Sequence, residues 1–227
     1  MSLTDLITIT RLLSLNYYRQ IIFTELLVLN VQSQSSLFTI RYATSRDVGY
    51  VANILTESFY RNSNHRVNFL LRSFTDWVYP LLRYGIMLDL SSRFGEKAPC
   101  YACLIATHPA NKSQAVASLE ICMRYVPVKS HREFWLWSEM QQHPYIFNLA
   151  VHPQWRRRGV AKQLLLAAEQ TVKRWGFSRL YMHVLEDNQP AYNLYERTGY
   201  QLHHQEGSVS FWLLGRPRRF LLQKKLS

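Results

Sequence analysis

The sequence predicts an α/β fold, in the broader sense α+β, with helices flanking one mixed β-sheet. Three observations predict it. Strand-like and helix-like stretches interleave along most of the chain, as expected when helices pack on a sheet. The stretch from Tyr145 to Val151 is mainly apolar, which is typical of a strand covered on both faces. Hydrophobic residues make up 48% of the 227 residues and aromatic residues 14%, which is enough for a packed core.

Residues 1–36 are predicted to be an N-terminal extension, and residues 37–227 the folded domain. Apolar residues from Leu3 to Tyr17 follow a helical stripe, and the polar stretch Gln32 to Ser36 reads as a linker. We expect the extension to be helical and to pack on its own domain; a partner protein or a membrane surface is the alternative. No apolar run approaches the roughly 18 residues of a membrane-spanning helix, so no transmembrane segment is expected.

The front half of the domain is predicted from its periodicities. Residues 38–42 alternate like a strand, and Ser45 is a suitable N-cap for the helix that follows. Residues 66–90 have apolar positions at helical spacing, and we expect Pro80 to end or kink that helix. Two strand-like runs, Cys100 to Thr107 and Ala115 to Tyr125, flank a turn-forming spacer and predict a hairpin. A loop is expected at 127–144.

The back half has the clearest pattern. After the strand at 145–151, Val160 to Trp175 is strongly helical and ends at Gly176. A strand at 179–185 and a short helix from Pro190 to Arg197 follow. The last predicted pieces are strands at 200–203 and 209–214 and an edge piece at 220–222.

Charge and cysteine content exclude several classes of protein. Charged residues are only 19% of the chain, which excludes global disorder. Three cysteines, Cys100, Cys103 and Cys122, exclude a disulfide scaffold and are expected to be reduced and buried in strands. The net charge of +12 is concentrated in the C-terminal third and predicts phosphate-bearing partners such as nucleic acid, anionic lipid or a phosphorylated cofactor.

The junction between the strand at 145–151 and the helix at 160–175 has the features of an anion site. The first turn of a helix carries free N–H groups and the positive end of the helix dipole. Gly159 allows backbone conformations that other residues rarely adopt, and Ala161 is small. The glycines are too few for a nucleotide P-loop or a dinucleotide fingerprint. A capped helix with solvated arginines is the alternative.

Two motifs resemble the GCN5-related N-acetyltransferase (GNAT) superfamily. The first is Arg156-x-x-Gly159-x-Ala161, after a strand that ends at a Val-x-Pro turn. The second runs from Asn188 to Tyr200 and is similar to the family's Asn-x-x-Ala-x-x-Leu-Tyr-x-x-x-Gly-Phe. Further stretches, including Tyr-Ile-x-Asn-Leu-Ala-Val and Lys-Arg-Trp-Gly, resemble the plant plastid and cyanobacterial branch. The resemblance is strong over about 145–200 and does not cover 1–36.

This resemblance implies a mixed sheet that splays in its middle, with acetyl-CoA as co-substrate wedged between the fourth and fifth strands. It implies that Leu149, Ala150 and Val151 hydrogen-bond the pantetheine arm, and that Asn188 reaches the pantetheine or the ADP. The pyrophosphate would be held at the turn after the strand, by Arg156, Arg157, Arg158, Gly159, Val160, Ala161 and Lys162. No metal is expected, because the adjacent His203 and His204 on a strand point to opposite faces.

Three residues are candidates for proton transfer. The resemblance implies that Tyr195 is the acid that protonates the departing CoA thiolate, a role that suits a phenol. Glu120 and His183 lie on strands beside the expected splay and are the candidates for the base. A core tyrosine, an exposed carboxylate and a structural histidine are the respective alternatives.

The predicted function is acetyl-CoA-dependent transfer of an acetyl group to a protein amine, either an N-terminal α-amine or a lysine ε-amine. Transfer to a small arylalkylamine-type acceptor is one alternative, and a non-catalytic module in a larger complex is another. The basic C-terminus, Arg216 to Lys225, motivates an anionic partner such as the ribosome. The predicted location is the cytoplasm, or the plastid stroma in a eukaryote. Tyr60, Trp77 and Tyr84 are aromatic candidates for the acceptor side.

Overall fold

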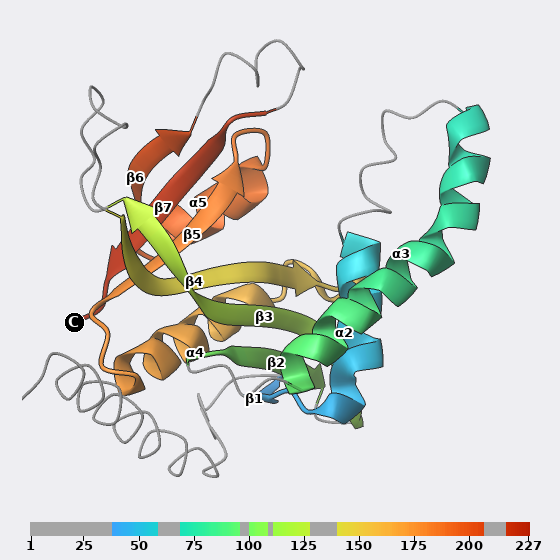
Figure 1. Ribbon diagram of the computed structural model, residues 1–227, viewed down its shortest axis with the longest axis horizontal. Helices are drawn as coiled ribbons and strands as arrows, with labels where there is room; N and C mark the ends of the chain where they lie inside the picture. The colour runs from blue at the N-terminus through green and yellow to red at the C-terminus, as the bar shows by residue number, and fades with distance from the viewer. Residues whose placement is uncertain (1–37, 59–68, 96–99, 109–110, 128–139, 207–216) are drawn as a thin grey trace, which may run out of the picture.

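The computed structural model describes residues 38–58, 69–95, 100–108, 111–127, 140–206 and 217–227, without the side chains of 69–78, 95 and 111–113. These residues form one seven-stranded sheet with strand order β1-β2-β3-β4-β5-β7-β6 (Figure 1). Its strands are β1 (Thr39–Tyr42), β2 (Ala102–His108), β3 (Asn111–Pro127), β4 (Met140–Val151), β5 (Arg179–Leu185), β6 (Gln201–Glu206) and β7 (Arg219–Lys225).

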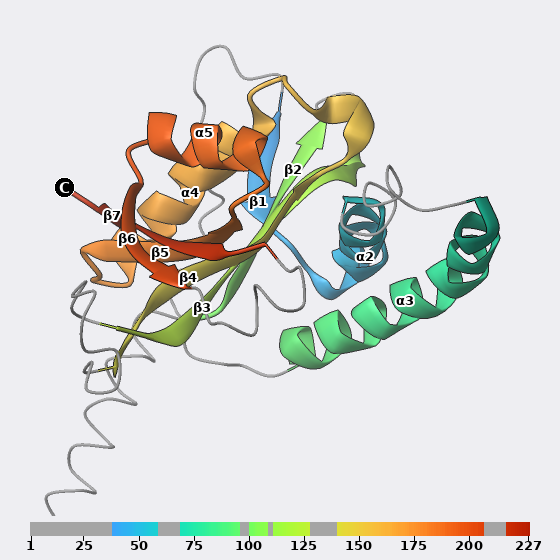
Figure 2. The ribbon, with the colours of Figure 1, turned by 90° about the horizontal axis from the view of Figure 1, so that it is seen from above.

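Helices cover both faces of the sheet. Figure 2 shows α4 (Val160–Arg174) and α5 (Gln189–Arg197) on one face and α2 (Val48–Thr56) and α3 (Phe69–Gly95) on the other. On the first face, Leu164 and Leu165 of α4 are fully buried against the sheet. Burying a leucine contributes about 1.5–3 kcal/mol, so this packing holds the start of α4 against β4. The predicted α/β fold with a mixed, flanked sheet is confirmed.

Strand pairing divides the sheet into two parts. The pairs within β1 to β4 and within β5, β7 and β6 are antiparallel. The two parts meet only where β4 and β5 run parallel, at Tyr145 opposite Tyr181 and Ile146 opposite Met182. Beyond these pairs β4 and β5 diverge, as Figure 1 shows. The predicted central splay is therefore present.

Several predicted boundaries were wrong. The helix does not end at Pro80, which lies inside α3; the kink expected there as the alternative agrees with Figure 1, in which the axis of α3 bends along its length. Ser45 is not the N-cap of α2: it begins a 3-10 turn (Ser45–Asp47) whose N-cap is Thr44, and Asp47 is the N-cap of α2. Cys100 precedes β2 instead of belonging to it, with a φ of 58°.

The strand predictions need two further corrections. β4 begins at Met140 within the predicted loop, because its polar first residues pair with the far end of β3. The predicted edge piece at 220–222 is β7, which lies inside the sheet between β5 and β6. The extension 1–36 and the predicted strand 209–214 lie outside the described residues.

Candidate active site

The splay leaves one edge of β4 without a partner strand. Residues 147–151 continue to pair with β3 on one side, while β5 pairs with β4 only at Tyr145 and Ile146. The backbone N–H of His152 donates to Val116 of β3, so by alternation the backbone groups of Val151 face the splay. The carbonyl of Val151 there accepts hydrogen bonds from Arg156 and Ser58. An open strand edge can bind an extended, amide-containing ligand as an added strand.

A β-bulge shapes this edge. Glu120 is opposite Phe147 and Ser118 is opposite Ala150, so two residues of β4 face one residue of β3. Asn148, one of the two, has a φ of 53°, a conformation that asparagine tolerates better than most residues. The bulge bends β4 away from β5 at the point where the two strands part.

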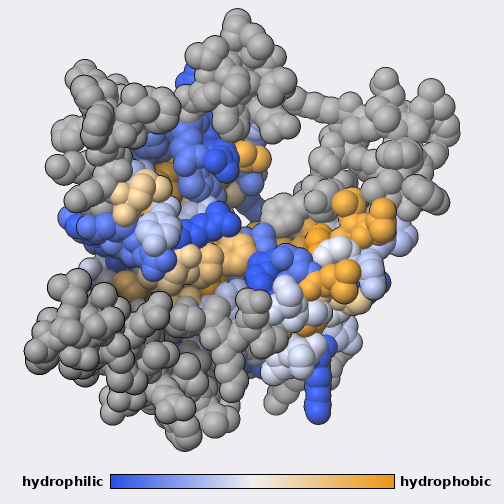
Figure 3. Space-filling model, viewed as in Figure 1, coloured by the Kyte–Doolittle hydropathy of each residue, from blue (hydrophilic) through white to orange (hydrophobic). Residues whose placement is uncertain are grey.

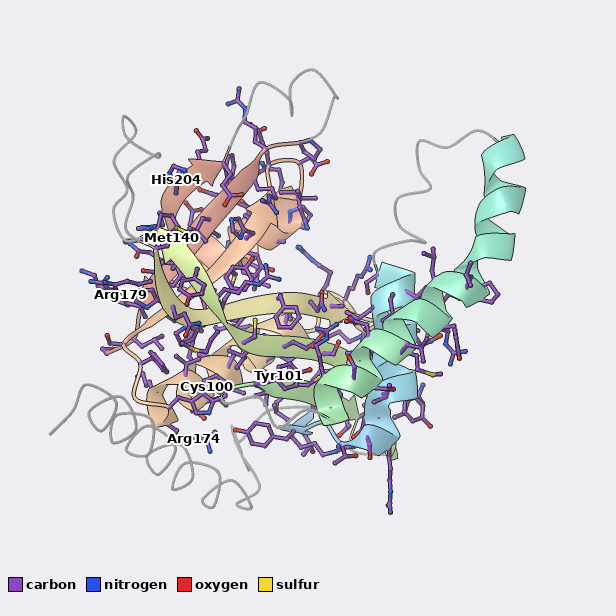
Figure 4. All side chains as sticks on the ribbon, in the orientation of Figure 1. Cys100, Tyr101, Met140, Arg174, Arg179 and His204 are labelled. Carbon is purple, nitrogen blue, oxygen red and sulfur yellow. The ribbon has the colours of Figure 1, made fainter. Side chains whose placement is uncertain are left out.

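Glu120 holds the bulge from β3. Its side chain is 0% exposed, and its Oε1 accepts a hydrogen bond of 2.8 Å from Asn148 Nδ2. Its Oε2 accepts from Arg93 Nη1 of α3 at 2.8 Å and from the hydroxyl of Tyr101 at 2.7 Å. Burial, together with the charge of Glu120, raises the pKa of Tyr101, so this phenol remains a donor. Figure 4 shows Tyr101 beside the C-terminal end of α3. The expected alternative of an exposed carboxylate is therefore wrong.

The turn after β4 presents backbone donors. A 3-10 helix (Pro153–Trp155) leads into Arg157 at φ 64° and Gly159 at φ 79°, and α4 begins at Val160. No acceptor for the backbone N–H groups of 157–162 is found among the described parts of the chain. A Cβ on Gly159 would meet nothing within 4 Å, so the positive φ is what favours glycine there. Such a run of N–H groups at a helix start suits a pyrophosphate.

The basic side chains of the turn have different surroundings. Arg156 Nε donates to the Val151 carbonyl at 3.1 Å, which ties the turn to the end of β4. The guanidinium of Arg158 lies over the Trp155 ring, 4.9 Å from its centroid. Arg157 and Lys162 are exposed. The positive charge of the turn is therefore available to an anion in solution.

The second motif places Tyr195 beneath the sheet. Asn188 is the N-cap of α5, and its Oδ1 accepts from the Ala191 N–H at 3.3 Å. About two turns later, Tyr195 is 7% exposed and packs edge-to-face on Tyr200 with ring centroids 6.2 Å apart. Burial, with a smaller contribution from nearby Tyr145, raises the pKa of Tyr195 to about 12. The phenol is therefore fully protonated at neutral pH.

His183 lies between two polar side chains from other strands. Its Nδ1 is 2.7 Å from the hydroxyl of Tyr145 on β4, and its Nε2 is 2.8 Å from Oε1 of Glu206 on β6. The hydrogen bond from His183 lowers the pKa of Glu206, with the charges of His183 and Arg219 adding to it against burial. Sequence reasoning named His183 but missed both partners, because strand pairing brings them together from 38 and 23 residues away.

Figure 3 shows the surface hollowed between the hydrophilic side chains over β5, β6 and β7 and the apolar side chains over α2 and α3. On the α3 side, Leu81, Tyr84 and Leu88 are more than half exposed. Of the expected aromatic acceptor residues, Tyr84 is exposed on α3, Tyr60 lies outside the described residues, and the side chain of Trp77 is not described.

None of the helices in the described residues has the length and hydropathy of a membrane-spanning helix. Within the same ranges no group of histidine, cysteine and acidic side chains is arranged to hold a metal ion. His203 is buried, with Nε2 2.8 Å from the carbonyl of Pro127.

Comparisons with known proteins agree with this geometry. GCN5-related N-acetyltransferase 10, chloroplastic, from Arabidopsis thaliana is 26% identical over 69% of this chain. An uncharacterized N-acetyltransferase, YycN, from Bacillus subtilis is 38% identical over 30% of it. The matched regions span 62% and 46% of these relatives' own lengths.

Solved structures support the same fold at low sequence identity. The PaiA N-acetyltransferase of Thermoplasma acidophilum, solved in complex with coenzyme A, superposes with a TM-score of 0.50 at 18% identity, covering 83% of this chain and 98% of that one. A GNAT acetyltransferase of Streptococcus pneumoniae gives 0.52 at 13% identity, covering 84% and 99%.

Residues 72–200, more than half of the chain, match the model of the acetyltransferase (GNAT) family. Chloroplastic relatives from Arabidopsis thaliana also support the plastid branch that the sequence indicated. The predicted resemblance is confirmed, and the chain belongs to the GNAT acetyltransferase family.

Proposed function

We propose that this protein is an acetyl-CoA-dependent N-acetyltransferase that acetylates protein amines by direct attack of the amine on the thioester. One observation carries the proposal. The open, bulged edge of β4 leads directly into a turn with unused N–H groups, and a buried, protonated phenol lies nearby on α5. Family membership supports it, as do the N-acetyltransferase names of the relatives.

The residues present fit acetyl-CoA. Leu149, Ala150 and Val151 would bind the pantetheine arm along the open edge of β4. The amides of residues 157–162 would hold the pyrophosphate, with the arginines and Lys162 supplying charge. Asn188 would act by fixing the start of α5, since its side-chain oxygen already caps that helix. When bound, acetyl-CoA supplies an activated acyl group that a neutral amine can attack.

Tyr195 is proposed as the acid. Amine attack on a thioester expels a thiolate, which needs a proton. A phenol with a pKa of about 12 keeps its proton over the working range of pH. Burial therefore keeps this residue in its protonated form until the thiolate leaves.

His183 and Glu120 are the two proposed bases. His183 has a carboxylate at one ring nitrogen, which stabilises the imidazolium that forms when it accepts a proton. Glu120 is fully buried and has three donors on its carboxylate, which leaves little of it accessible to the substrate's proton. The geometry favours His183 as the base and Glu120 as a positioning residue for the bulge.

A protein amine is proposed as the acceptor, either an N-terminal α-amine or a lysine ε-amine. The positive charge of the chain favours acidic peptides and disfavours polyamines. In the basic C-terminal run, Arg219 and Lys224 pair with Glu206 and Glu169, and this leaves Arg218 and Lys225 exposed for an anionic partner. The chloroplastic relatives support a stromal location.

Peptide libraries incubated with the protein and acetyl-CoA test the proposal. Mass spectrometry resolves α-amine from ε-amine products, and a thiol reagent follows CoA release. Tyr195→Phe is the matched variant, since it removes the acidic proton and keeps the ring packed on Tyr200. Acetylated peptide from the native protein supports the proposal. Products with serotonin-like amines alone would replace the acceptor class, and no thiol release with any amine would overturn the function.

A further inference from the structure

The hydrogen bonds of His183 define its chemical state. Its Nε2 faces the carboxylate of Glu206 at 2.8 Å, and a carboxylate with a lowered pKa only accepts hydrogen bonds. Nε2 therefore carries the hydrogen, and in the neutral ring Nδ1 has a free lone pair. Burial raises the pKa of Tyr145, so its hydroxyl is the donor to Nδ1 at 2.7 Å. The order Glu206, His183, Tyr145 thus has the polarity of a carboxylate–imidazole–hydroxyl triad.

The splay creates the place for this group. Tyr145 belongs to one of the two pairs that join β4 to β5, and it is 5% exposed. Because β5 leaves β4 after Met182, the backbone N–H of His183 has no partner on β4 and donates instead to the Tyr145 hydroxyl at 3.1 Å. The backbone N–H and the imidazole ring of His183 thus both contact the Tyr145 oxygen, at the end of the splay where β4 and β5 still pair.

Tyr145 also makes a small contribution to the raised pKa of Tyr195, which comes mainly from burial. Charged groups from the remaining elements surround the chain of hydrogen bonds. Arg219 of β7 pairs with the second oxygen of Glu206 at 2.6 Å, and the guanidinium of Arg124 of β3 lies 5.0 Å from the centroid of the Tyr145 ring.

We propose that Tyr145, His183 and Glu206 form a proton relay that accepts the proton lost by the amine. This inference rests on the proposed acetyl transfer. As the amine nitrogen bonds to the acyl carbon, its proton passes to the Tyr145 oxygen, and the proton of Tyr145 passes to Nδ1 of His183. The C–S bond then breaks, and Tyr195 gives its proton to the thiolate.

The relay then resets. After the products leave, the imidazolium releases one proton to solvent and the Tyr195 phenolate takes up one proton from solvent. One N–H bond is lost and one S–H bond is gained, so the exchange with solvent is even. Tyr145 is the catalytic residue of the relay, His183 stores the proton, and Glu206 is a positioning residue that holds the tautomer and stabilises the imidazolium.

Two substitutions interrupt the relay and two controls leave it intact. Tyr145→Phe and His183→Gln should each lower kcat/KM about 10²-fold, the smaller end of the effect of a general base. Both should keep the coenzyme A dissociation constant within twofold by calorimetry. Tyr181→Phe is the matched control, because Tyr181 pairs with Tyr145 across the strands and its buried hydroxyl has no hydrogen-bond partner. His204→Gln on β6 is the second control.

The charge of Glu206 separates proton transfer from a structural role. Glu206→Gln keeps an acceptor for Nε2–H but removes the charge that stabilises the imidazolium, so kcat should fall while the coenzyme A dissociation constant stays within twofold. An unchanged kcat in this variant, or a His183→Gln rate within twofold of the native rate, would overturn the relay.

NMR of ¹⁵N-labelled histidine tests the inference without turnover. The native protein should show the neutral His183 ring protonated on Nε2. A neutral ring protonated on Nδ1 would overturn the relay even if acetyl transfer is confirmed. If the tautomer is as expected but the native protein releases no thiol with any amine, the proposed function has failed instead.

Discussion

Replacing Glu120 tests how the bulge in β4 is held. Glu120→Ala removes the shared acceptor of three partly buried donors, those of Arg93, Tyr101 and Asn148. Removing one partner of a buried ion pair costs about 3–5 kcal/mol, and the Glu120 side chain is 0% exposed while that of Arg93 is 24% exposed. For a chain of this size each 1 kcal/mol corresponds to a change of roughly 2–4 °C, so the melting temperature should fall by about 6–20 °C.

Unfolding by denaturant gives the free energy, and calorimetry with coenzyme A gives the consequence for the site. Asn148 loses its partner, so the bulge relaxes and coenzyme A should bind more weakly. Glu196→Ala, an exposed carboxylate on α5, is the control and should change the free energy of unfolding by less than about 0.5 kcal/mol. A Glu120→Ala protein within 1 kcal/mol of the native stability would refute the reasoning.

The isosteric variant separates two roles of the same residue. In Glu120→Gln the new amide oxygen can accept from Arg93 and Tyr101, and its N–H can donate to Asn148 after that side chain turns over. A positioning residue should therefore tolerate the change with kcat reduced only a few-fold. A loss of about 10²-fold in kcat, with coenzyme A affinity unchanged, would make Glu120 the base.

Three further predictions follow from single features. Tyr195→Phe should lower kcat about 10²-fold at unchanged coenzyme A affinity. The native activity should persist in alkaline solution until the Tyr195 phenol, with a pKa of about 12, ionises. Thiol-release rates measured against pH check both. Gly159→Ala should weaken coenzyme A binding and destabilise the fold by about 1–2 kcal/mol through its φ of 79° alone, because no neighbour opposes the Cβ; titration calorimetry and thermal unfolding measure these. The pKa of Asp47 is lowered, because hydrogen bonds from Arg41 and Thr44 outweigh burial. Asp47 therefore stabilises the fold above its unfolded pKa of about 3.9, and this contribution is lost as the pH falls through the lower folded value. Asp47→Asn should reduce this acid dependence in denaturation curves.

Local signals were sufficient for the clearest parts of the fold. The apolar stripe of α4 with Gly159 before it lies within a single segment, so hydrophobic period and turn chemistry predict it, whereas Asn188 and Tyr195 of α5 were indicated by the resemblance to the family's motif. The turn before α4, the proposed anion site, was predicted from local residues as well. Asn148 in an apolar strand was also a local signal, since asparagine tolerates positive φ, but its bulge was not predicted.

Other features arise between segments. The length of β4 before Tyr145 comes from pairing with β3, and the interior position of β7 from pairing with both β5 and β6. Neither strand has an apolar pattern strong enough to reveal a partner. The sequence therefore suggested a loop for the first and an edge for the second.

Order along the chain thus determined the helices and the turn after β4, because helix and turn formation depend on residues a few positions apart, and the resemblance to the family's motif indicated Tyr195. Only the folded sheet decided which side chains meet at the splay. Glu120 receives Arg93 from 27 residues away, and His183 receives Tyr145 from 38 residues away. Such contacts depend on strand register and on where two strands part, and these are settled by the packing of the whole domain.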